Sequence, residues 1–241
     1  MIRTDERTPE QMRQVKITRN YIPHAEGSVL MELGRTRVVC AVTFEDGVPG
    51  FLKGTGSGWV TAEYSMLPRS TPERSKREAV IGRQGGRTME IQRLIGRSLR
   101  AVTDMRAFGE RTFWVDCDVI EADGGTRTAA ITGAYVALRD AFSTLMDEGA
   151  FDKDPASGHL AAMSVGIING VPCLDLCFEE DVHAEVDLNL VANDAGEIVE
   201  IQGTAERKPF ACAELDTMID LGLAGIAELI EHQKAALGDR A

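Results

Sequence analysis

Residues 115–133, VDCDVIEADGGTRTAAITG, determine how this chain of 241 residues is organised. Segment 115–121 alternates at a period of two residues, which predicts a buried strand. From residue 129 to about residue 145 the apolar positions follow a helical spacing. The break between the two patterns is the run 123–125, Asp-Gly-Gly, so the segment is predicted to be a strand, a glycine turn and the start of a helix.

The glycine turn is a candidate anion site formed by Gly125, Thr126 and Arg127. A strand-to-helix turn directs unpaired backbone N–H groups at one point, and the helix N-terminus carries about half a positive charge. Glycine lets an anion approach the backbone closely, while a hydroxyl and a guanidinium complete a cradle of the size of a phosphate. An ordinary structural turn, in which Thr126 only caps the helix, is the alternative interpretation.

The composition is typical of a soluble globular protein and argues against a membrane protein. Hydrophobic residues make up 44% of the chain and charged residues 27%. No apolar run reaches the ~18–20 residues of a membrane span, and the polar N-terminus lacks the apolar core of a signal peptide. The five scattered cysteines fit reduced thiols. We therefore expect a cytoplasmic protein.

The net charge of −12 hides a basic segment at residues 69–111. Eleven basic and five acidic residues give this segment a charge of +6, which leaves −18 for the remainder. Because salt screens distant charges beyond about 10 Å, a polyanion would sense the local patch. Arg69, Arg74 and Arg77 lie in a proline-containing loop and suit contacts with backbone phosphates. A solvated loop with ion pairs such as Glu73–Arg77 is the alternative.

A second arginine repeats the pattern of the glycine turn. Arg87 follows a double glycine where a loop meets the predicted amphipathic helix over 88–104, so that Arg87, like Arg127, is expected just inside a helix. Arginine presents a planar fork that can bind two phosphate oxygens at once. Arg87 and Arg127 together are therefore a better candidate anion pair than either alone.

A carboxylate pair in the second half is a candidate site for one divalent cation. Asp181 and Asp187 are six residues apart, one in a predicted acidic loop and one on the next strand. Two carboxylates at such a corner can hold Mg²⁺ or Mn²⁺, with water completing the coordination. Asp175 and Asn189 could assist there. A solvated acidic loop is the alternative, and three neighbouring acids are expected to be solvated: Glu179, Glu180 and Glu185.

The chain is predicted to consist of two halves, 1–150 and 151–241, joined by a polar connection at 147–158. Each half shows several strands followed by a helix. Strands are expected at 28–33, 37–44, 59–64, 115–121, 160–168, 171–178, 185–192 and 197–203, and a long amphipathic helix at about 211–236. The similar order suggests a duplicated fold, although the residues themselves do not repeat.

Taken together, the candidate sites predict one type of reaction. Two arginines and a glycine turn would hold a small anion, a carboxylate pair would hold a metal ion, and a basic loop would hold a polyanion. Two anions that must react repel each other, by about 1 kcal/mol at ~4 Å in water and by more in a drier site. Arginine and metal remove this barrier, so we expect inorganic phosphate to attack a phosphodiester.

The sequence resembles the RNase PH family of phosphorolytic exoribonucleases that process the 3′ ends of tRNA. The matching segments are 19–43, 58–71, 82–101, 116–138, 175–191 and 200–206. The resemblance implies an α+β fold of tandem βαβ-type halves with a left-handed crossover, like a ribosomal-protein domain. It also implies a homo-hexamer built as a trimer of dimers.

The resemblance also assigns roles to individual residues. Orthophosphate would be held by Arg87 and by Gly125, Thr126 and Arg127. A catalytic Mg²⁺ or Mn²⁺ would lie at Asp181 and Asp187. Precursor tRNA and other RNA 3′ ends would be bound through the three loop arginines Arg69, Arg74 and Arg77.

Two other functions remain open at this stage. A non-catalytic RNA-binding ring subunit would lack the paired acids or the arginines, whereas this chain has all of them. A hydrolytic nuclease would activate water with a metal on the same carboxylates. Polynucleotide phosphorylases, which are related to the RNase PH family, carry a lysine where this chain has Asn189, so the role of Asn189 is also open.

Overall fold

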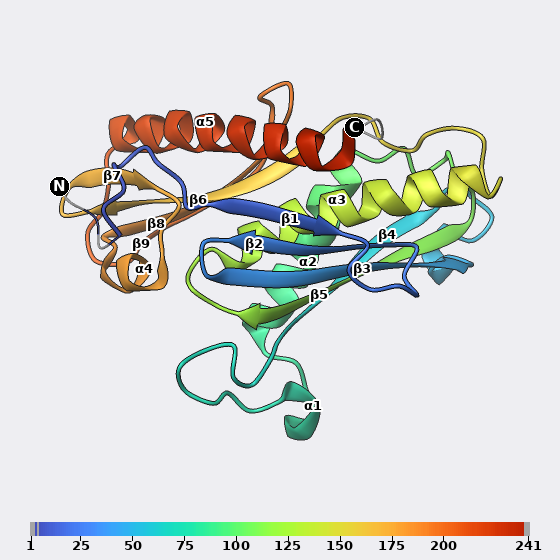
Figure 1. The fold of residues 1–241 in the computed structure, drawn as a ribbon, viewed down its shortest axis with the longest axis horizontal. Coiled ribbons are helices and arrows are strands. Elements are labelled where there is room, and N and C mark those ends of the chain that lie inside the picture. Colours follow the sequence, from blue (N-terminus) through green and yellow to red (C-terminus); the bar gives the residue numbers. More distant parts are fainter. Residues whose placement is uncertain (1–2, 4, 239–241) are drawn as a thin grey trace.

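The computed structural model describes residue 3 and residues 5–238, and it is an α+β fold with one β-sheet in each half (Figure 1). The first sheet has the strand order β1-β2-β3-β5-β4. Its strands are β1 (Val15–Arg19), β2 (Gly27–Leu33), β3 (Thr36–Asp46), β4 (Trp59–Met66) and β5 (Arg111–Glu121). Strands β4 and β5 are parallel and the other neighbours are antiparallel, so the sheet is mixed.

The second sheet is antiparallel throughout, in the order β7-β6-β8-β9. Its strands are β6 (Leu160–Ile168), β7 (Val171–Leu174), β8 (Val186–Asn193) and β9 (Ile198–Ala205). The helices of the molecule are α1 (Glu78–Ile81), α2 (Gly86–Ala101), α3 (Thr126–Asp147), α4 (Phe178–His183) and α5 (Cys212–Leu237), with a short 3₁₀ turn at Gly50–Leu52. The α+β class expected from the sequence is therefore confirmed.

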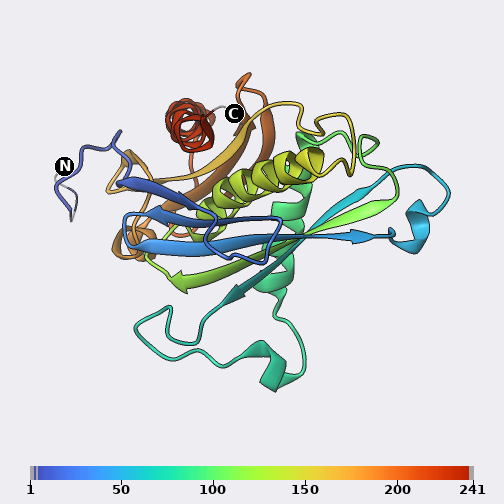
Figure 2. The ribbon, with the colours of Figure 1, turned by 45° about the vertical axis from the view of Figure 1, so that its right-hand side comes forward.

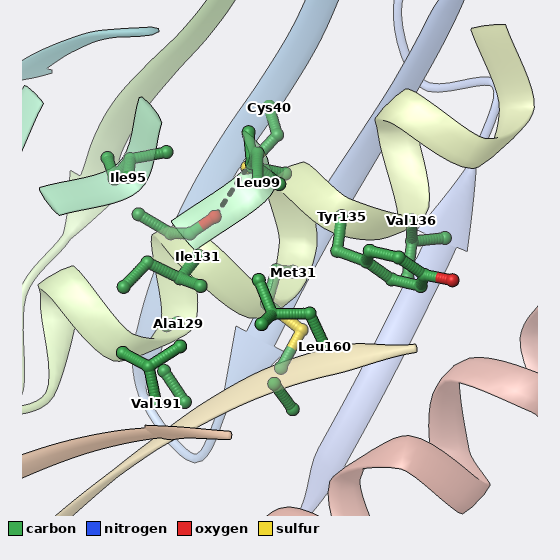
Figure 3. Packing of buried hydrophobic residues seen from close by; sticks show 14 of the residues in the cluster. Met31, Cys40, Ile95, Leu99, Ala129, Ile131, Tyr135, Val136, Leu160 and Val191 are labelled. Carbon is green, nitrogen blue, oxygen red and sulfur yellow. Dashed lines mark hydrogen bonds between the residues drawn. The ribbon is translucent and has the colours of Figure 1, made fainter. Parts of the chain in front are cut away.

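Helix α3 lies between the two sheets and is the centre of the hydrophobic core. It contacts β2 and β3 of the first sheet and β6 of the second. This position explains why α3 is apolar on nearly all sides, whereas a surface helix has one apolar stripe. Figure 3 shows Met31 of β2, Ile131 of α3 and Leu160 of β6 packed together. One core thus contains side chains from both halves of the chain.

Strand β6 is buried along its whole length because helices cover both of its faces. Helix α3 packs on one side, and α5 runs along the other side of the second sheet (Figures 1 and 2). The uninterrupted apolar sequence LAAMSVGII is the pattern expected of a strand with two buried faces. None of the helices in the described part of the chain combines the length and apolar character needed for a membrane span.

The structure differs from the sequence-based expectation in three segments. Strand β1 was not predicted, because it is only five residues long and forms by pairing with β2. The predicted acidic loop contains the short helix α4. The strand expected over 171–178 ends at Leu174, because the next residue, Asp175, turns with a positive φ of 53° and directs its carboxylate into the interior.

Candidate functional site

Four of the predicted site residues, the two arginines and the two aspartates, line one cavity of about 780 Å³. Arg87 and Arg127 enter it from the first turns of α2 and α3, and the N-cap residue of each helix belongs to a Gly-Gly pair. Asp181 enters from α4, and Asp187 enters from the beginning of β8. The cavity therefore combines side chains from both halves of the chain.

The glycine turn before α3 has the conformation that an anion loop requires. Gly124 and Gly125 have φ values of 78° and 64°, in the left-handed region that favours glycine. A Cβ on Gly124 would also overlap the backbone of Leu176 and Phe178, so a side chain there would push the turn away from the start of α4. Gly124 thus allows the anion loop and the helix that carries Asp181 to pack directly against each other.

Thr126 lies at the start of α3 but does not cap it. The N-cap residue is Gly125, without a side-chain cap, so the interpretation of Thr126 as an N-cap is wrong. The Thr126 hydroxyl accepts a hydrogen bond of 2.9 Å from the hydroxyl of Tyr64. Neither Thr126 nor Gly125 is among the side chains that line the cavity, although Arg127 beside them is. Burial raises the pKa of Tyr64, which keeps this phenol a hydrogen-bond donor at neutral pH.

The two arginines differ in how they are held. The Arg127 side chain is 17% exposed, and its Nη1 lies 3.2 Å from Gln202 Oε1 and 3.5 Å from Glu90 Oε2. Arg87 is exposed, and it forms no side-chain hydrogen bond or ion pair with residue 3 or residues 5–238. Arg87 therefore has its full hydrogen-bonding capacity available for a ligand.

Asp181 and Asp187 lie close enough for their charges to interact. Burial, and then the negative charge of Asp181, raises the pKa of Asp187 to about 6. Burial also raises the pKa of Asp181, which the charges of Arg87 and Arg127 oppose. Asn189 donates a hydrogen bond of 3.3 Å to Asp187 Oδ2, which agrees with the assisting position expected for it.

The carboxylate pair has the donor chemistry that Mg²⁺ prefers. This ion binds proteins through one or two carboxylates and takes its other ligands from water and substrate phosphates. Two carboxylates that lie near each other and are partly desolvated are stabilised by a cation between them, and the same burial and neighbouring charge raise the pKa of Asp187. No cluster of three or more His, Cys, Asp or Glu side chains suited to a metal occurs in the described chain.

The loop arginines lie outside this cavity. Arg69, Arg74 and Arg77 are exposed on the segment between β4 and α2, which projects away from both sheets with α1 (Figures 1 and 2). Arg77 lines a second cavity of about 710 Å³, and Arg87 lines both cavities. Across the described residues, Glu73 and Arg77 form no ion pair. Arg87 is thus shared by the two cavities, and Arg77 is the loop arginine that lies beside the second one.

Two acids expected near the metal corner have a different role. Asp175 is fully buried, and its carboxylate accepts hydrogen bonds from Arg13 at 2.9 and 2.7 Å. Glu180 was expected to be solvated, but it is buried and pairs with Arg3 at 2.7 and 2.5 Å. Both acids anchor the N-terminal segment against α4, and no local pattern predicts partners that lie more than 160 residues away in the chain.

We expect Asp175→Asn to destabilise the protein by about 3 kcal/mol at neutral pH, because the buried Arg13 would keep only its longer contact of 3.7 Å with Asp123. Burial alone would raise the pKa of Asp175, but the hydrogen bonds and charge of Arg13 outweigh it and lower this pKa. The contribution is therefore present above the unfolded pKa of about 3.9 and is lost as the pH falls through the lower folded value.

Urea unfolding at neutral and acidic pH measures this effect. The difference in unfolding free energy between wild type and Asp175→Asn should shrink as the wild-type carboxylate is protonated. Asp216→Asn, which changes an exposed carboxylate on α5, serves as the control and should leave stability unchanged. An equal loss for both variants would contradict the role of the buried pair.

Sequence reasoning missed Glu90, which lines the cavity, and two further residues around the site. Gln202 on β9 contacts both Arg127 and Glu90, and Tyr64 on β4 contacts Thr126. Neither residue type stands out in a sequence as a ligand for phosphate or metal. Only the pairing of β8 with β9 brings Gln202 to the cavity, and only the pairing of β4 with β5 places Tyr64 beside Thr126.

Comparison with known proteins gives two family matches and several similar structures. The model of the 3′ exoribonuclease family, domain 1, matches residues 11–143, and that of domain 2 matches residues 159–225. Rice (Oryza sativa) Rrp46 is similar over 98% of this chain and 100% of its own, with 21% identity and a TM-score of 0.78.

Two exosome structures are similar as well. The Archaeoglobus fulgidus exosome with RNA bound to the active site matches 95% of this chain and 92% of its own, with 21% identity and a TM-score of 0.83. An archaeal exosome core matches 96% of this chain and 91% of its own, with 21% identity and a TM-score of 0.77. At this identity the similarity shows the fold.

Proposed function

Because this chain belongs to the 3′ exoribonuclease family, we propose that it is a phosphate-dependent 3′→5′ exoribonuclease that trims precursor tRNA and releases nucleoside diphosphates. The observation that carries the proposal is the meeting of two arginines and two carboxylates in one cavity. An arginine pair suits a free phosphate, and a carboxylate pair suits a divalent cation. A water-activating nuclease would have little use for the arginine pair.

In the proposed reaction, an oxygen of orthophosphate attacks the phosphorus of the last phosphodiester. The bond to the 3′ oxygen of the preceding nucleotide breaks, so the RNA shortens by one nucleotide and a nucleoside diphosphate leaves. Arg87 and Arg127 hold the attacking phosphate and offset its repulsion from the RNA phosphate. The nucleophile is already an anion, so no residue has to act as a strong base. The same contacts serve the reverse reaction.

Asp181 and Asp187 would hold the Mg²⁺ or Mn²⁺ ion, which when bound supplies positive charge to the phosphate oxygens. Asn189 orients Asp187 through its hydrogen bond. Gly125 and Thr126 contribute the start of α3, whose positive end favours an anion. The chain's own part is thus mostly positioning and charge, which is what phosphoryl and nucleotidyl transfer require.

The decisive experiment follows the products from a tRNA with extra 3′ nucleotides, incubated with and without inorganic phosphate. The proposal requires that nucleoside diphosphates are released when phosphate is present and that the tRNA is not shortened when phosphate is absent. Nucleoside monophosphates in the absence of phosphate would establish a hydrolytic nuclease. Bound but intact RNA in both reactions would establish a non-catalytic ring subunit.

We also propose a homo-hexamer in the cytoplasm, formed as a trimer of dimers. The similarity in fold to subunits of exosome assemblies supports a ring, and the absence of disulfides among the described cysteines fits reducing conditions. Light scattering coupled to size-exclusion chromatography tests the assembly. A mass of six times 26.2 kDa is expected, and a monomer would contradict it.

Replacing Arg69, Arg74 and Arg77 together by alanine is expected to weaken RNA binding and its dependence on salt. Each phosphate contact to single-stranded RNA contributes about 0.7 to the slope of log K against log salt, so three contacts give a loss of about 2. Because these side chains lie outside the catalytic cavity, kcat at saturating RNA should change little. An unchanged salt slope would contradict the role of the loop.

A further inference from the structure

One carboxylate lies within the proposed phosphate site and is not explained by metal binding. Glu90 is on α2, one turn after Arg87, and lines the same cavity. Its Oε2 lies 3.5 Å from Arg127 Nη1. An acid at this place repels an incoming phosphate and also occupies one of the two guanidinium groups expected to bind it. A site built only for tight anion binding would not contain it.

Arg127 has two polar partners, the charged Glu90 and the neutral Gln202. Gln202 Oε1 accepts a hydrogen bond of 3.2 Å from Arg127 Nη1, and Gln202 Nε2 donates one of 2.9 Å to Glu90 Oε1. The amide therefore bridges the arginine and the glutamate. Both Glu90 and Gln202 restrain Arg127, but only Glu90 carries a charge that a phosphate must overcome.

Gln202 is itself fixed from the other side. Its Nε2 lies 3.3 Å from Glu200 Oε1, and Glu200 forms a two-point ion pair with Arg97 of α2 at 2.5 and 2.7 Å. Arg127 would thus keep a neutral, well-anchored neighbour if Glu90 moved away. A mutation of Glu90 can therefore remove the negative charge beside Arg127 while Gln202 still holds the Arg127 side chain in place.

The ion pair between Glu90 and Arg127 is weak enough for a phosphate to replace Glu90 as the partner of Arg127. The Glu90 side chain is 41% exposed, and an ion pair with one exposed member is weak because water screens it. A bidentate contact between arginine and phosphate is stronger than a single long contact to a screened carboxylate. Phosphate can therefore displace Glu90 from Arg127, at the cost of part of its binding free energy.

We propose that Glu90 is an internal counter-ion that competes with inorganic phosphate for Arg127 and thereby sets the phosphate affinity of the site. The proposal rests on the proposed function, since it concerns the same anion site. Glu90 holds Arg127 while the site is empty and keeps phosphate binding weak enough for the substrate to exchange. Glu90 is a positioning residue in this scheme, because it acts on phosphate through Arg127.

The test is a calorimetric titration of inorganic phosphate into the full-length protein at a fixed magnesium concentration, without RNA. Glu90→Gln should bind phosphate about fivefold more tightly, which is the size expected for removing one screened ion pair. Glu90→Ala should shift the affinity in the same direction, because the effect depends on charge and not on shape. Gln202→Met should weaken phosphate binding, because it removes the neutral restraint on Arg127.

The sign of the change separates this proposal from a structural role. If Glu90 only held Arg127 in place, Glu90→Gln would bind phosphate as wild type does or more weakly, and either result overturns the proposal. Glu228→Gln is the control, because it removes the same charge from an exposed residue of α5 that does not line the cavity. This variant should bind phosphate with the affinity of wild type. Should wild type bind no phosphate, the proposed function fails together with this inference.

Discussion

Arg87→Ala is expected to remove phosphorolysis while leaving the fold and RNA binding largely intact. Loss of one group that stabilises developing charge typically reduces kcat by about 10²–10³-fold, and Arg87 would also hold the attacking phosphate. The fold should tolerate the change, because the exposed Arg87 side chain has no polar partner within the described chain. Release of nucleoside diphosphates at a series of phosphate concentrations measures the effect.

Arg93→Ala provides the matched control for this experiment. Arg93 is on the same helix and is exposed, but it does not line the cavity. Both variants lose one positive charge from the basic segment, so a general electrostatic effect would appear in both. A normal KM for phosphate and a normal rate in Arg87→Ala would contradict the assignment of Arg87 to the phosphate site.

Asp187→Asn is expected to abolish the metal-dependent activity without weakening the fold. The change removes half of the carboxylate pair, so Mg²⁺ should no longer support turnover at concentrations that saturate wild type. Magnesium titration of the rate, together with thermal unfolding of the same proteins in the absence of magnesium, gives both readouts. Active sites commonly hold such groups at a cost in stability, so a separation of activity from stability is diagnostic.

The pKa of Asp187 gives the sign of the stability change. Because its pKa is raised to about 6, the folded state binds this proton more tightly than the unfolded chain does. The wild-type carboxylate therefore destabilises the fold increasingly as the pH rises from about 4 to about 6, and fully above that range. Asp187→Asn should unfold at a higher temperature than wild type at about pH 8, and the two should converge near about pH 4.

An exposed acid on α4 serves as the control for the metal experiment. Glu179→Gln alters a side chain beside Asp181 that does not line the cavity, so it should keep the magnesium dependence of wild type. Unchanged magnesium dependence in Asp187→Asn would contradict the metal site. A large fall in its melting temperature at neutral pH would show that Asp187 stabilises the fold.

Several features of the candidate site depend only on short segments of the chain and could be predicted from the sequence. A Gly-Gly pair followed by arginine and a helical pattern predicts a helix start with the arginine in its first turn, and both α2 and α3 confirm this. The apolar run of β6 and the Asn169-Gly170 turn likewise predict the first hairpin of the second sheet. These signals depend on neighbours within a few residues.

The environments of individual acids could not be predicted in the same way. Glu180 and Asp181 are adjacent in the sequence, yet Glu180 is buried against Arg3 while Asp181 lines the cavity. Their difference depends on an N-terminal segment that returns to α4 from more than 160 residues away. Gln202 is a similar case, because its contact with Arg127 exists only where β9 approaches α2 and α3.

The sequence by itself determined the main strands and helices, the glycine turns and the residue types available for an anion, a metal ion and RNA. Period, turn residues and helix starts are local properties, so the chain carries them directly. Only the tertiary structure decided that Arg87, Arg127, Asp181 and Asp187 share one cavity, and that Glu90 and Gln202 flank Arg127. Packing both sheets around α3 sets these distances, and no local pattern encodes them.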